Sequence, residues 1–335
     1  MSARRIAYLS FTDRGSALAE RLKASLGGTA ACTRRIEDFS LSRWTAEAFQ
    51  AYDALVFVGA VGIAVRAIAP HLQSKGRDPA VVAVDERGRF AVPVVSGHLG
   101  GANDLAREIS KICGAAAVIT TATDAGGLFA VDEWARRQDC AVTDLRSIKT
   151  VSAKILAGET LRVRSEWPVE GTCPEGVIMT EGGDWDVRVD VRRHDGGLCL
   201  APRALVLGVG CRRGTPREAL EAAFQALCEE ERLWPEAVRG AATIDLKAEE
   251  PGLLAFCAAH GWPLAVYSPE ELRRTEGAFT PSAFVEKTTG VDNVCERSAV
   301  RSAGGPLLTG KHAGNGVAMA LAWRPVRLDW RWEYG

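Results

Sequence analysis

The sequence predicts an α/β protein with two α/β domains, the N-terminal one built on a mostly parallel sheet and the C-terminal one on a mixed sheet. Three observations support this fold class. The 335 residues suffice for roughly two domains of about 150 residues each. Strand-like apolar runs alternate with amphipathic segments, and glycine turns separate them. This alternation stops near residue 141 and resumes near residue 204. We therefore expect domains at 1–145 and 203–330, joined by an irregular or antiparallel middle region at 146–202.

The N-terminal elements follow from short apolar runs and from helical spacing. Leu18, Leu22 and Leu26 share one helical face. Continuous apolar runs such as 54–58 are typical of strands covered on both faces. The patterns predict strands at 5–10, 54–58, 80–85, 90–95 and 115–120, and helices at 16–26, 104–113 and 128–138.

The middle region differs in composition. After a predicted helix at 149–156, prolines and glycines are frequent, and apolar residues alternate from Trp185 to Val191. Such alternation is typical of an antiparallel strand with one solvated face. We therefore expect a connecting region with some antiparallel strand.

The C-terminal part returns to the α/β pattern. Thr215, Pro216 and Glu218 predict a helix start, with the threonine as N-cap, the proline at the first helical position and the glutamate closing a capping box. The segments 306–311 and 316–322 predict a closing hairpin. Further patterns predict strands at 204–210, 243–246 and 264–267, and helices at 251–260 and from 280 to about 290.

Charge and cysteine usage exclude several classes of protein. Lys and Arg number 41 against 42 Asp and Glu, a net charge of -1, so no overall field favours nucleic acid or an anionic membrane. The nine cysteines are dispersed, without a C-x-x-C metal or redox pair. The apolar runs are too short for a secretory leader or a membrane span. We expect reduced thiols, a cytoplasmic location and no metal site in the protein itself.

The segment 96–104, Ser-Gly-His-Leu-Gly-Gly-Ala-Asn-Asp, lies between a predicted strand end and a helix start. Ligands bind at such places in α/β sheets, because glycine turns let backbone N–H groups approach and a helix N-terminus favours negative charge. His98 has the chemistry of a general acid or base near neutral pH. The alternative is a tight structural turn, since the glycines do not match G-x-G-x-x-G.

A second glycine-rich segment, 208–215, runs into the predicted helix start. Arg212 and Arg213 would suit a carboxylate or a phosphate at this position. Cys211 is a candidate nucleophile, because a helix N-terminus lowers the pKa of a thiol. The alternative is a buried thiol beside two solvated arginines.

Three further segments carry weaker signals. The segment 305–312 nearly matches a P-loop, but His312 replaces the hydroxyl that would hold magnesium, which disfavours a nucleotide-dependent enzyme. Lys311 and His312 remain polar groups at a strand end.

The hydroxyls and carboxylate of 120–124 would either bind polar ligand groups or cap a turn. Glu286, beside Lys287, is either a ligand contact or part of a solvated charge pair.

Eight strings occur in one order along the chain: VGAVGIAVR at 58–66, DPAVV at 78–82, DERGRF at 85–90, SGHLGGAN at 96–103, TTATD at 120–124, GVGCRRGT at 208–215, IDLK at 244–247 and TGV at 289–291. With these strings, the sequence resembles the cobalt-precorrin-5A hydrolase family of the anaerobic, early-cobalt route to cobalamin. The resemblance extends from about residue 6 to about residue 321. The C-terminal domain alone also resembles a small stand-alone protein of the aerobic route.

The resemblance implies a hydrolase that opens the δ-lactone of cobalt-precorrin-5A and releases acetaldehyde, giving cobalt-precorrin-5B. It implies no organic cofactor, because the substrate carries the cobalt. The implied partners are this cobalt-containing tetrapyrrole and, transiently, neighbouring enzymes of the pathway, without nucleic acid or membrane. The alternative is a non-catalytic tetrapyrrole carrier of the same pathway.

Lactone opening needs an activated water and a donor to the developing oxyanion. We therefore predict His98 as the base, and Lys311 or the N–H groups of Gly100 and Gly101 as the oxyanion donor. A cleft between the domains would cover the flat macrocycle, and cationic groups would hold its carboxylates. The predicted substrate-binding residues are Ser96, Gly97, Gly100, Gly101, Asn103, Thr123, Asp124, Arg212, Arg213, Thr215, Glu286 and His312.

Overall fold

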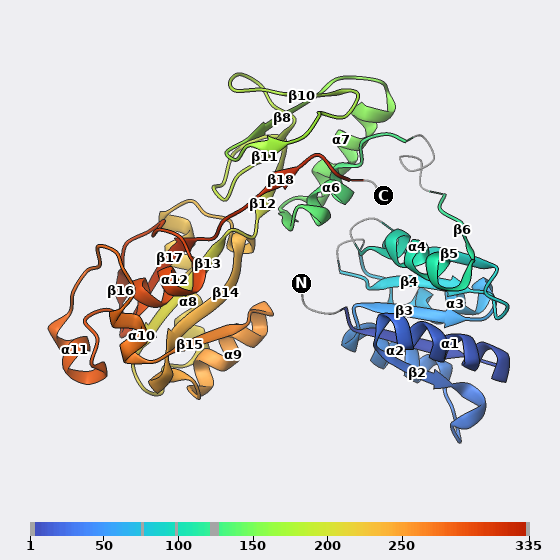
Figure 1. Cartoon of the computed structure of the whole chain (residues 1–335), viewed down its shortest axis with the longest axis horizontal. Coiled ribbons are helices and arrows are strands. Elements are labelled where there is room, and N and C mark those ends of the chain that lie inside the picture. The colour runs from blue at the N-terminus through green and yellow to red at the C-terminus, as the bar shows by residue number, and fades with distance from the viewer. Residues whose placement is uncertain (1–3, 75–76, 98–99, 121–126, 333–335) are drawn as a thin grey trace. The chain divides into compact units, whose positions relative to one another are not determined.

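A computed structural model describes residues 4–74, 77–97, 100–120 and 127–332 (Figure 1). The chain divides into two compact units. The first unit is Met1–Arg136 with Trp332–Gly335, and the second unit is Arg137–Arg331. Residues 146–202 therefore lie within the second unit, together with the C-terminal α/β segment.

The first unit contains a six-stranded sheet in the order β2-β1-β3-β4-β5-β6. Neighbouring strands are parallel except β4 and β5, which a tight turn joins as an antiparallel pair. The mostly parallel sheet is thus confirmed. Its strands are β1 (Ile6–Ser10), β2 (Thr29–Cys32), β3 (Ala54–Val58), β4 (Ala80–Val84), β5 (Phe90–Val95) and β6 (Ala116–Ala117). Its helices are α1 (Asp13–Leu26), η1 (Thr33–Arg35), α2 (Leu41–Ala51), α3 (Val61–Ile68), η2 (Ala69–His71), α4 (Ala102–Cys113) and α6 (Val131–Arg137), which ends at the boundary between the units.

Both faces of this sheet are buried. Ile6 and Tyr8 pack with α1 and α4, whereas Ala7 and Leu9 pack with α2 and α3. The sequence analysis missed α2 and α3. Helix α3 starts inside the apolar run that also contains β3, and a continuous apolar run has no period that separates a strand from a helix.

The middle region is more regular than the sequence predicts. It forms a five-stranded sheet in the order β10-β8-β11-β12-β7, and only the β12–β7 pair is antiparallel. The prediction of antiparallel strand was therefore wrong for the alternating run, because β11 pairs in parallel with β8 and with β12. The elements are β7 (Cys140–Val142), α7 (Leu145–Leu156), β8 (Leu161–Ser165), β9 (Val169–Glu170), β10 (Val177–Met179), β11 (Val187–Val189) and β12 (Leu198–Pro202).

The C-terminal sheet has the order β15-β14-β13-β17-β16. Strands β13, β14 and β15 are parallel, and β17 is antiparallel to both of its neighbours, which confirms a mixed sheet. Its strands are β13 (Leu205–Cys211), β14 (Val238–Ile244), β15 (Leu264–Tyr267), β16 (His312–Gly314) and β17 (Val317–Trp323). The helices are α8 (Arg217–Glu230), η3 (Pro235–Ala237), η4 (Asp245–Lys247), α9 (Pro251–His260), α10 (Pro269–Arg273), α11 (Ala283–Thr289) and α12 (Cys295–Ala303).

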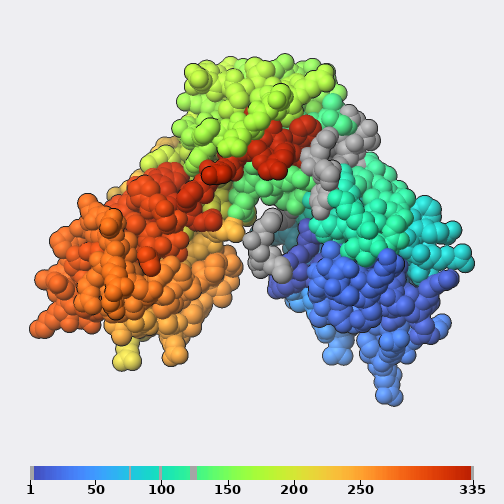
Figure 2. Space-filling model, viewed as in Figure 1, coloured from blue at the N-terminus to red at the C-terminus, as the bar shows by residue number. Residues whose placement is uncertain are grey.

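Helices cover both faces of this sheet as well. Leu207 and Val209 pack with α8 and α9, whereas Val206 packs with α12 on the opposite face. The chain then returns to the middle region, where β18 (Leu328–Asp329) pairs in parallel with β9. Figures 1 and 2 show this C-terminal segment, in red, running along the yellow-green middle region.

Two of the differences from the predicted elements concern segments that carry candidate site residues. Helix α8 begins at Arg217, and Pro216 rather than Thr215 is its N-cap, without a side-chain hydrogen bond. The first strand of the closing hairpin is β16, not 306–311, and the turn is formed by Asn315 and Gly316 with φ of 50° and 81°. Positive φ at both turn residues matches the right-handed twist of the strands, which explains the Asn-Gly pair.

Candidate functional site

Strand direction decides where the 96–104 segment lies. Because β5 is antiparallel to β4, its carboxyl end lies at the amino edge of β1, β3 and β4. The side chain of Ser96 accordingly reaches Asp78, just before β4. Strand β6 is parallel to β5, so Thr120 follows toward the same edge. The structure thus directs segments 96–97, 100–104 and 118–120 to one edge of the sheet. His98, Thr123 and Asp124 lie outside the described residues.

The described part of this turn closes tightly upon itself. Ser96 has a φ of 56°, and its hydroxyl donates to the carbonyl of Asp78 at 2.9 Å. The N–H of Ala102 donates to the carbonyl of Ser96 at 3.0 Å, and that of Asn103 to the carbonyl of Gly97 at 3.0 Å. The first two N–H groups of α4 are therefore already used within the protein.

Three glycines of the turn fit positions that a larger residue would not. A Cβ at Gly97 would lie 2.9 Å from Oδ1 of the buried Asn103. A Cβ at Gly100 would lie 2.4 Å from the Cβ of Ser96, and Gly101 has a φ of 79°. These contacts support a structural role for the glycines. The proposed oxyanion donors at Gly100 and Gly101 remain predictions.

A charged cluster lies beside this turn and was missed by the sequence analysis. Asp104 is only 3% exposed and pairs with Arg136 and, at 3.3 Å, with Arg107. Arg136 also pairs with Glu133 at 2.6 Å. A Cβ at Gly101 would lie 2.9 Å from a guanidinium nitrogen of Arg4. No spacing rule in the sequence connects Arg136 to Asp104, because tertiary packing alone brings α6 to the start of α4.

In the second unit, the parallel strands β13, β14 and β15 place their carboxyl ends at one edge. The Arg212–Thr215 turn follows β13, and η4 follows β14. The N–H of Arg212 donates to the carbonyl of Gly316 at 3.0 Å, which holds this turn against the β16–β17 hairpin. A Cβ at Gly316 would lie 2.8 Å from Cδ of Arg212, so the arginine side chain crosses that glycine.

The carboxylate of Glu250 holds the Arg212–Thr215 turn in place. It accepts the N–H of Gly214 at 2.6 Å and pairs with Lys247 at 3.0 Å. The hydrogen bond from Lys247, followed by that from Gly214, holds the pKa of the Glu250 carboxyl below its usual value. The hydroxyl of Thr215 donates to the carbonyl of Arg212 at 2.8 Å, so it closes the turn instead of capping α8.

The two arginines of this turn are presented to solvent. Both Arg212 and Arg213 are exposed, and within the described ranges neither side chain forms an ion pair within 4.0 Å. Guanidinium groups fixed at the carboxyl edge of a sheet suit a carboxylate-bearing ligand. The sequence analysis identified both arginines. It did not predict that the Lys247–Glu250 pair would support the turn that carries them.

The Cys211 thiol does not fit a nucleophile. Burial raises its pKa, although nearby Lys247 offsets this in part. A nucleophilic cysteine needs the opposite shift, toward the thiolate. The alternative of a partly buried, protonated thiol is therefore favoured.

Lys311 and His312 lie away from the edge that carries Arg212. Through β17, Gly314 is level with Cys211, whereas His312 is level with Val209. His312 pairs through Nδ1 with Glu230 at 3.1 Å and through Nε2 with Glu231 at 3.3 Å, at the end of α8. The exposed Glu286 lies on α11, and within the described part of the chain no hydrogen bond or ion pair joins its side chain to the Arg212 turn.

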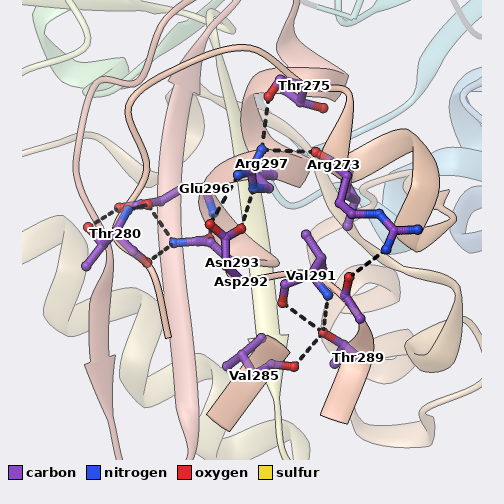
Figure 3. A network of polar contacts seen from close by, with 12 residues as sticks. Arg273, Thr275, Thr280, Val285, Thr289, Val291, Asp292, Asn293, Glu296 and Arg297 are labelled. Carbon is purple, nitrogen blue, oxygen red and sulfur yellow. Dashed lines mark hydrogen bonds and ion pairs between the residues drawn. The ribbon is translucent and has the colours of Figure 1, made fainter. Parts of the chain in front are cut away.

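The backbone of Lys311 is held by a buried carboxylate, Glu296, which is 1% exposed. Glu296 accepts the Lys311 N–H at 2.7 Å, the Thr280 N–H at 2.6 Å and the Asn293 amide at 2.6 Å. Figure 3 shows Glu296, Asn293 and Thr280 meeting beside the Asp292–Arg297 pair. Because donors from three segments surround both oxygens, Glu296 links the loops that precede α11, α12 and β16.

Comparison with known proteins decides the family. A family model described as Cobalamin synthesis G N-terminal matches residues 43–124, and one described as Cobalamin synthesis G C-terminus matches residues 205–322. A cobalt-precorrin-5A hydrolase of Salmonella typhimurium is 34% identical over 348 residues, covering 94% of this chain and 97% of that protein. A second, of Priestia megaterium, is 32% identical over 301 residues, covering 83% and 80%. This chain belongs to the cobalt-precorrin-5A hydrolase family. It is thus an enzyme with a role in cobalamin biosynthesis.

The two ranges matched by the family models contain every site residue that we predict for this hydrolase. The range 43–124 contains the strings from 58 to 124, and the range 205–322 contains those from 208 to 291. Protein CobE of Sinorhizobium sp is 33% identical over 113 residues, covering 33% of this chain and 73% of that protein. A third of the hydrolase chain therefore has a relative that is a protein of its own.

Two cavities of the described chain contain none of the predicted site residues. One, of about 610 Å³, lies in the second unit between the loop 274–279 and the end of α12. The other, of about 570 Å³, lies in the first unit between α1 and the β4–β5 turn. The DERGRF string of the family lies at the second cavity, a signal that the sequence analysis quoted without assigning it to a site.

Among the described residues, no group of three or more His, Cys, Asp or Glu side chains is arranged to hold a metal ion. No helix in the described ranges combines the length and apolar character needed to cross a membrane.

Proposed function

We propose that this chain opens the δ-lactone of cobalt-precorrin-5A with water and releases acetaldehyde, giving cobalt-precorrin-5B. The observation that supports this most strongly is the 34% identity over 94% of the chain to a protein named cobalt-precorrin-5A hydrolase. In this proposal cobalt enters with the substrate, and the protein needs no organic cofactor.

The chemistry consumes one water. Its oxygen adds to the acyl carbon of the lactone, and the ring oxygen is the leaving group. The two-carbon unit then departs as acetaldehyde when its bond to the macrocycle breaks, and the electron pair of that bond stays with the conjugated ring. The protein must therefore activate water, stabilise an oxyanion and hold a polycarboxylate ligand.

We assign these roles to both matched segments. Arg212 and Arg213 are fixed by their turn yet reach solvent, which suits them to hold substrate carboxylates. His98 is our candidate for the base that activates water. Lys311 is our candidate for the oxyanion donor, and the remaining predicted substrate contacts are proposals of the same kind.

The double variant Arg212→Ala/Arg213→Ala is expected to raise KM for the lactone about 10- to 100-fold and to change kcat much less, because it removes binding of the carboxylate fringe rather than chemistry. Steady-state acetaldehyde release measures both constants. The control is Arg203→Ala, an exposed arginine at the amino end of β13 that pairs with Asp139 at 3.2 Å. An unchanged KM in the double variant would remove these arginines from the substrate site.

Cys211→Ala is expected to retain most of the acetaldehyde release, because a partly buried thiol with a raised pKa is a poor nucleophile. Loss of a covalent nucleophile would instead cost on the order of 10³-fold or more. Single-turnover rates of the variant and the wild type distinguish these outcomes.

The decisive assay mixes purified protein with the lactone substrate and measures acetaldehyde and the corrinoid product. Acetaldehyde at a rate proportional to enzyme concentration is the expected result. Substrate binding without acetaldehyde would favour the tetrapyrrole carrier instead. We further propose the cytoplasm as the compartment, with transient contacts to neighbouring pathway enzymes and none to nucleic acid or membrane.

A further inference from the structure

Four arginines surround the 570 Å³ cavity of the first unit. Arg14 and Arg21 come from α1, and Arg87 and Arg89 come from the β4–β5 turn. Among the described residues that line the cavity, the one carboxylate is that of Glu86, which already accepts the hydroxyl of Thr12 at 2.5 Å. The cavity therefore carries an excess of positive charge, although the whole chain has a net charge of only -1.

Within the described residues, three of these arginines, Arg14, Arg21 and Arg87, form no ion pair. Arg89 pairs with Asp85 at 3.5 Å, and Arg21 donates to the carbonyl of Ile112. Within the ranges that the structure describes, no ion-pair partner lies within 4.0 Å of Arg14 or Arg87, and both side chains are exposed. Uncompensated guanidinium groups that converge on one cavity favour an anionic ligand.

The cavity also has an apolar floor. Ala17, Leu18 and Cys113 line it between the arginines. Gly88, with a φ of 67°, packs so that a Cβ there would lie 3.5 Å from both Leu18 and Cys113. The turn that carries Arg87 and Arg89 is thus seated directly on α1 and on the end of α4.

The spacing of the arginines favours a ligand with several anionic groups over a ligand with one. Arg14 and Arg21 are seven residues apart on α1, so their Cα atoms lie about 10 Å apart along the axis. One phosphate would engage one or two guanidinium groups, whereas a broad ligand with carboxylates on its periphery would reach both ends. The apolar floor suits the body of such a ligand.

The cavity also lies where α/β sheets bind ligands. Helix α1 follows the carboxyl end of β1, and the turn that carries Arg87 follows the carboxyl end of β4. This is the opposite edge from the 96–104 turn. Ligands of open α/β sheets bind outside the carboxyl ends of the strands.

We propose that the cavity lined by Arg14, Arg21, Arg87 and Arg89 is a binding site for the carboxylate periphery of a corrinoid. The ligand class rests on the proposed function, whereas the site itself rests on the four arginines and the apolar floor. The site holds the macrocycle through its carboxylates, and chemistry at the lactone is separate from it.

The test titrates the full-length protein with cobyrinic acid and, separately, with its fully methylated ester, and follows binding by equilibrium dialysis and corrinoid absorbance. The double variant Arg14→Ala/Arg87→Ala is expected to weaken binding of the acid at least about 10-fold and to reduce its salt dependence. The ester is expected to bind the wild type at least about 10-fold more weakly than the acid. Because Arg212 and Arg213 could bind the same probe, each titration is repeated in the Arg212→Ala/Arg213→Ala background.

The matched control is Arg34→Ala/Arg43→Ala, which removes two exposed arginines of the same unit that pair with Asp13 and Glu47. Circular dichroism confirms that each variant is folded. Equal binding of acid and ester would overturn the proposal, and so would a change below about twofold for Arg14→Ala/Arg87→Ala in both backgrounds. Displacement of the corrinoid by pyrophosphate at constant ionic strength would show a small-anion site instead.

The acetaldehyde assay keeps the two proposals apart. Arginine-dependent corrinoid binding without lactone hydrolysis would overturn the proposed reaction and leave this site standing. Lactone hydrolysis, together with corrinoid binding that Arg14→Ala/Arg87→Ala leaves unchanged, would overturn this site and leave the reaction standing.

Discussion

Gly208→Ala is expected to destabilise the second unit by at least about 3 kcal/mol, because the new methyl group would meet backbone atoms that cannot move aside. A Cβ at Gly208 would lie 1.8 Å from the carbonyl oxygen of Cys295 and 2.8 Å from the N–H nitrogen of Ala299. Helix α12 crosses β13 at this glycine. The substitution would therefore push α12 away from the sheet and open the packing around Val206 and Ala242. Urea unfolding followed by circular dichroism measures the loss.

Gly210→Ala is the matched control, two residues further along the same strand. Its Cβ would meet nothing closer than 3.8 Å, and its backbone needs no left-handed conformation. The expected change in the free energy of unfolding is below about 1 kcal/mol. Equal stability of the two variants, or equal destabilisation, would show that close approach of α12 is not the reason for glycine at position 208.

His98→Ala is expected to reduce acetaldehyde release at least about 100-fold while substrate binding remains, because a positioned general base typically contributes 10²–10⁴-fold. Rapid-quench measurement of acetaldehyde gives the rate, and equilibrium dialysis of the corrinoid gives the affinity. Near-wild-type turnover in this variant would remove His98 from the mechanism.

His98→Gln separates proton transfer from hydrogen bonding at the same position. Glutamine donates and accepts hydrogen bonds but does not take up a proton near neutral pH. If His98 is the base, the acidic limb of the kcat/KM profile is lost in both variants and the rate stays low in His98→Gln. A glutamine variant with restored activity and an unchanged pH profile would indicate a positioning role.

Local sequence patterns were sufficient for elements with a clear period or a buried run. Strand β1, helix α9 and strand β15 lie within one residue of the predicted bounds. The two strands are short apolar runs, whereas α9 is delimited by Pro251 in its first turn and by Gly261 after its end. Helix α12 was missed, because its core-facing residues are small or polar, such as Ser298, Ala299 and Ala303, and the segment contains few large apolar side chains. The same small residues let α12 approach Gly208 closely.

The glycine-rich strings show the limit of motif reasoning at the site. In 208–215 the sequence predicted a ligand-binding turn, and the exposed Arg212 and Arg213 fit that prediction. Gly208, however, lies inside β13 and makes room for a helix far along the chain. A string of glycines does not reveal which of them faces a ligand and which faces another backbone.

The sequence by itself determined the α/β class, the mixed C-terminal sheet and the family, because these depend on apolar periodicity and on long strings of identical residues. Only the tertiary structure decided which edge of a sheet each turn occupies. That choice depends on strand direction: β5 runs against β4 and carries Ser96 to the amino edge, while Arg87 stays at the carboxyl edge with Arg14. The turn at 85–89 reverses the chain locally, whereas the parallel pairing of β4 with β3 and of β3 with β1, between segments far apart in the sequence, sets the edge at which each turn lies.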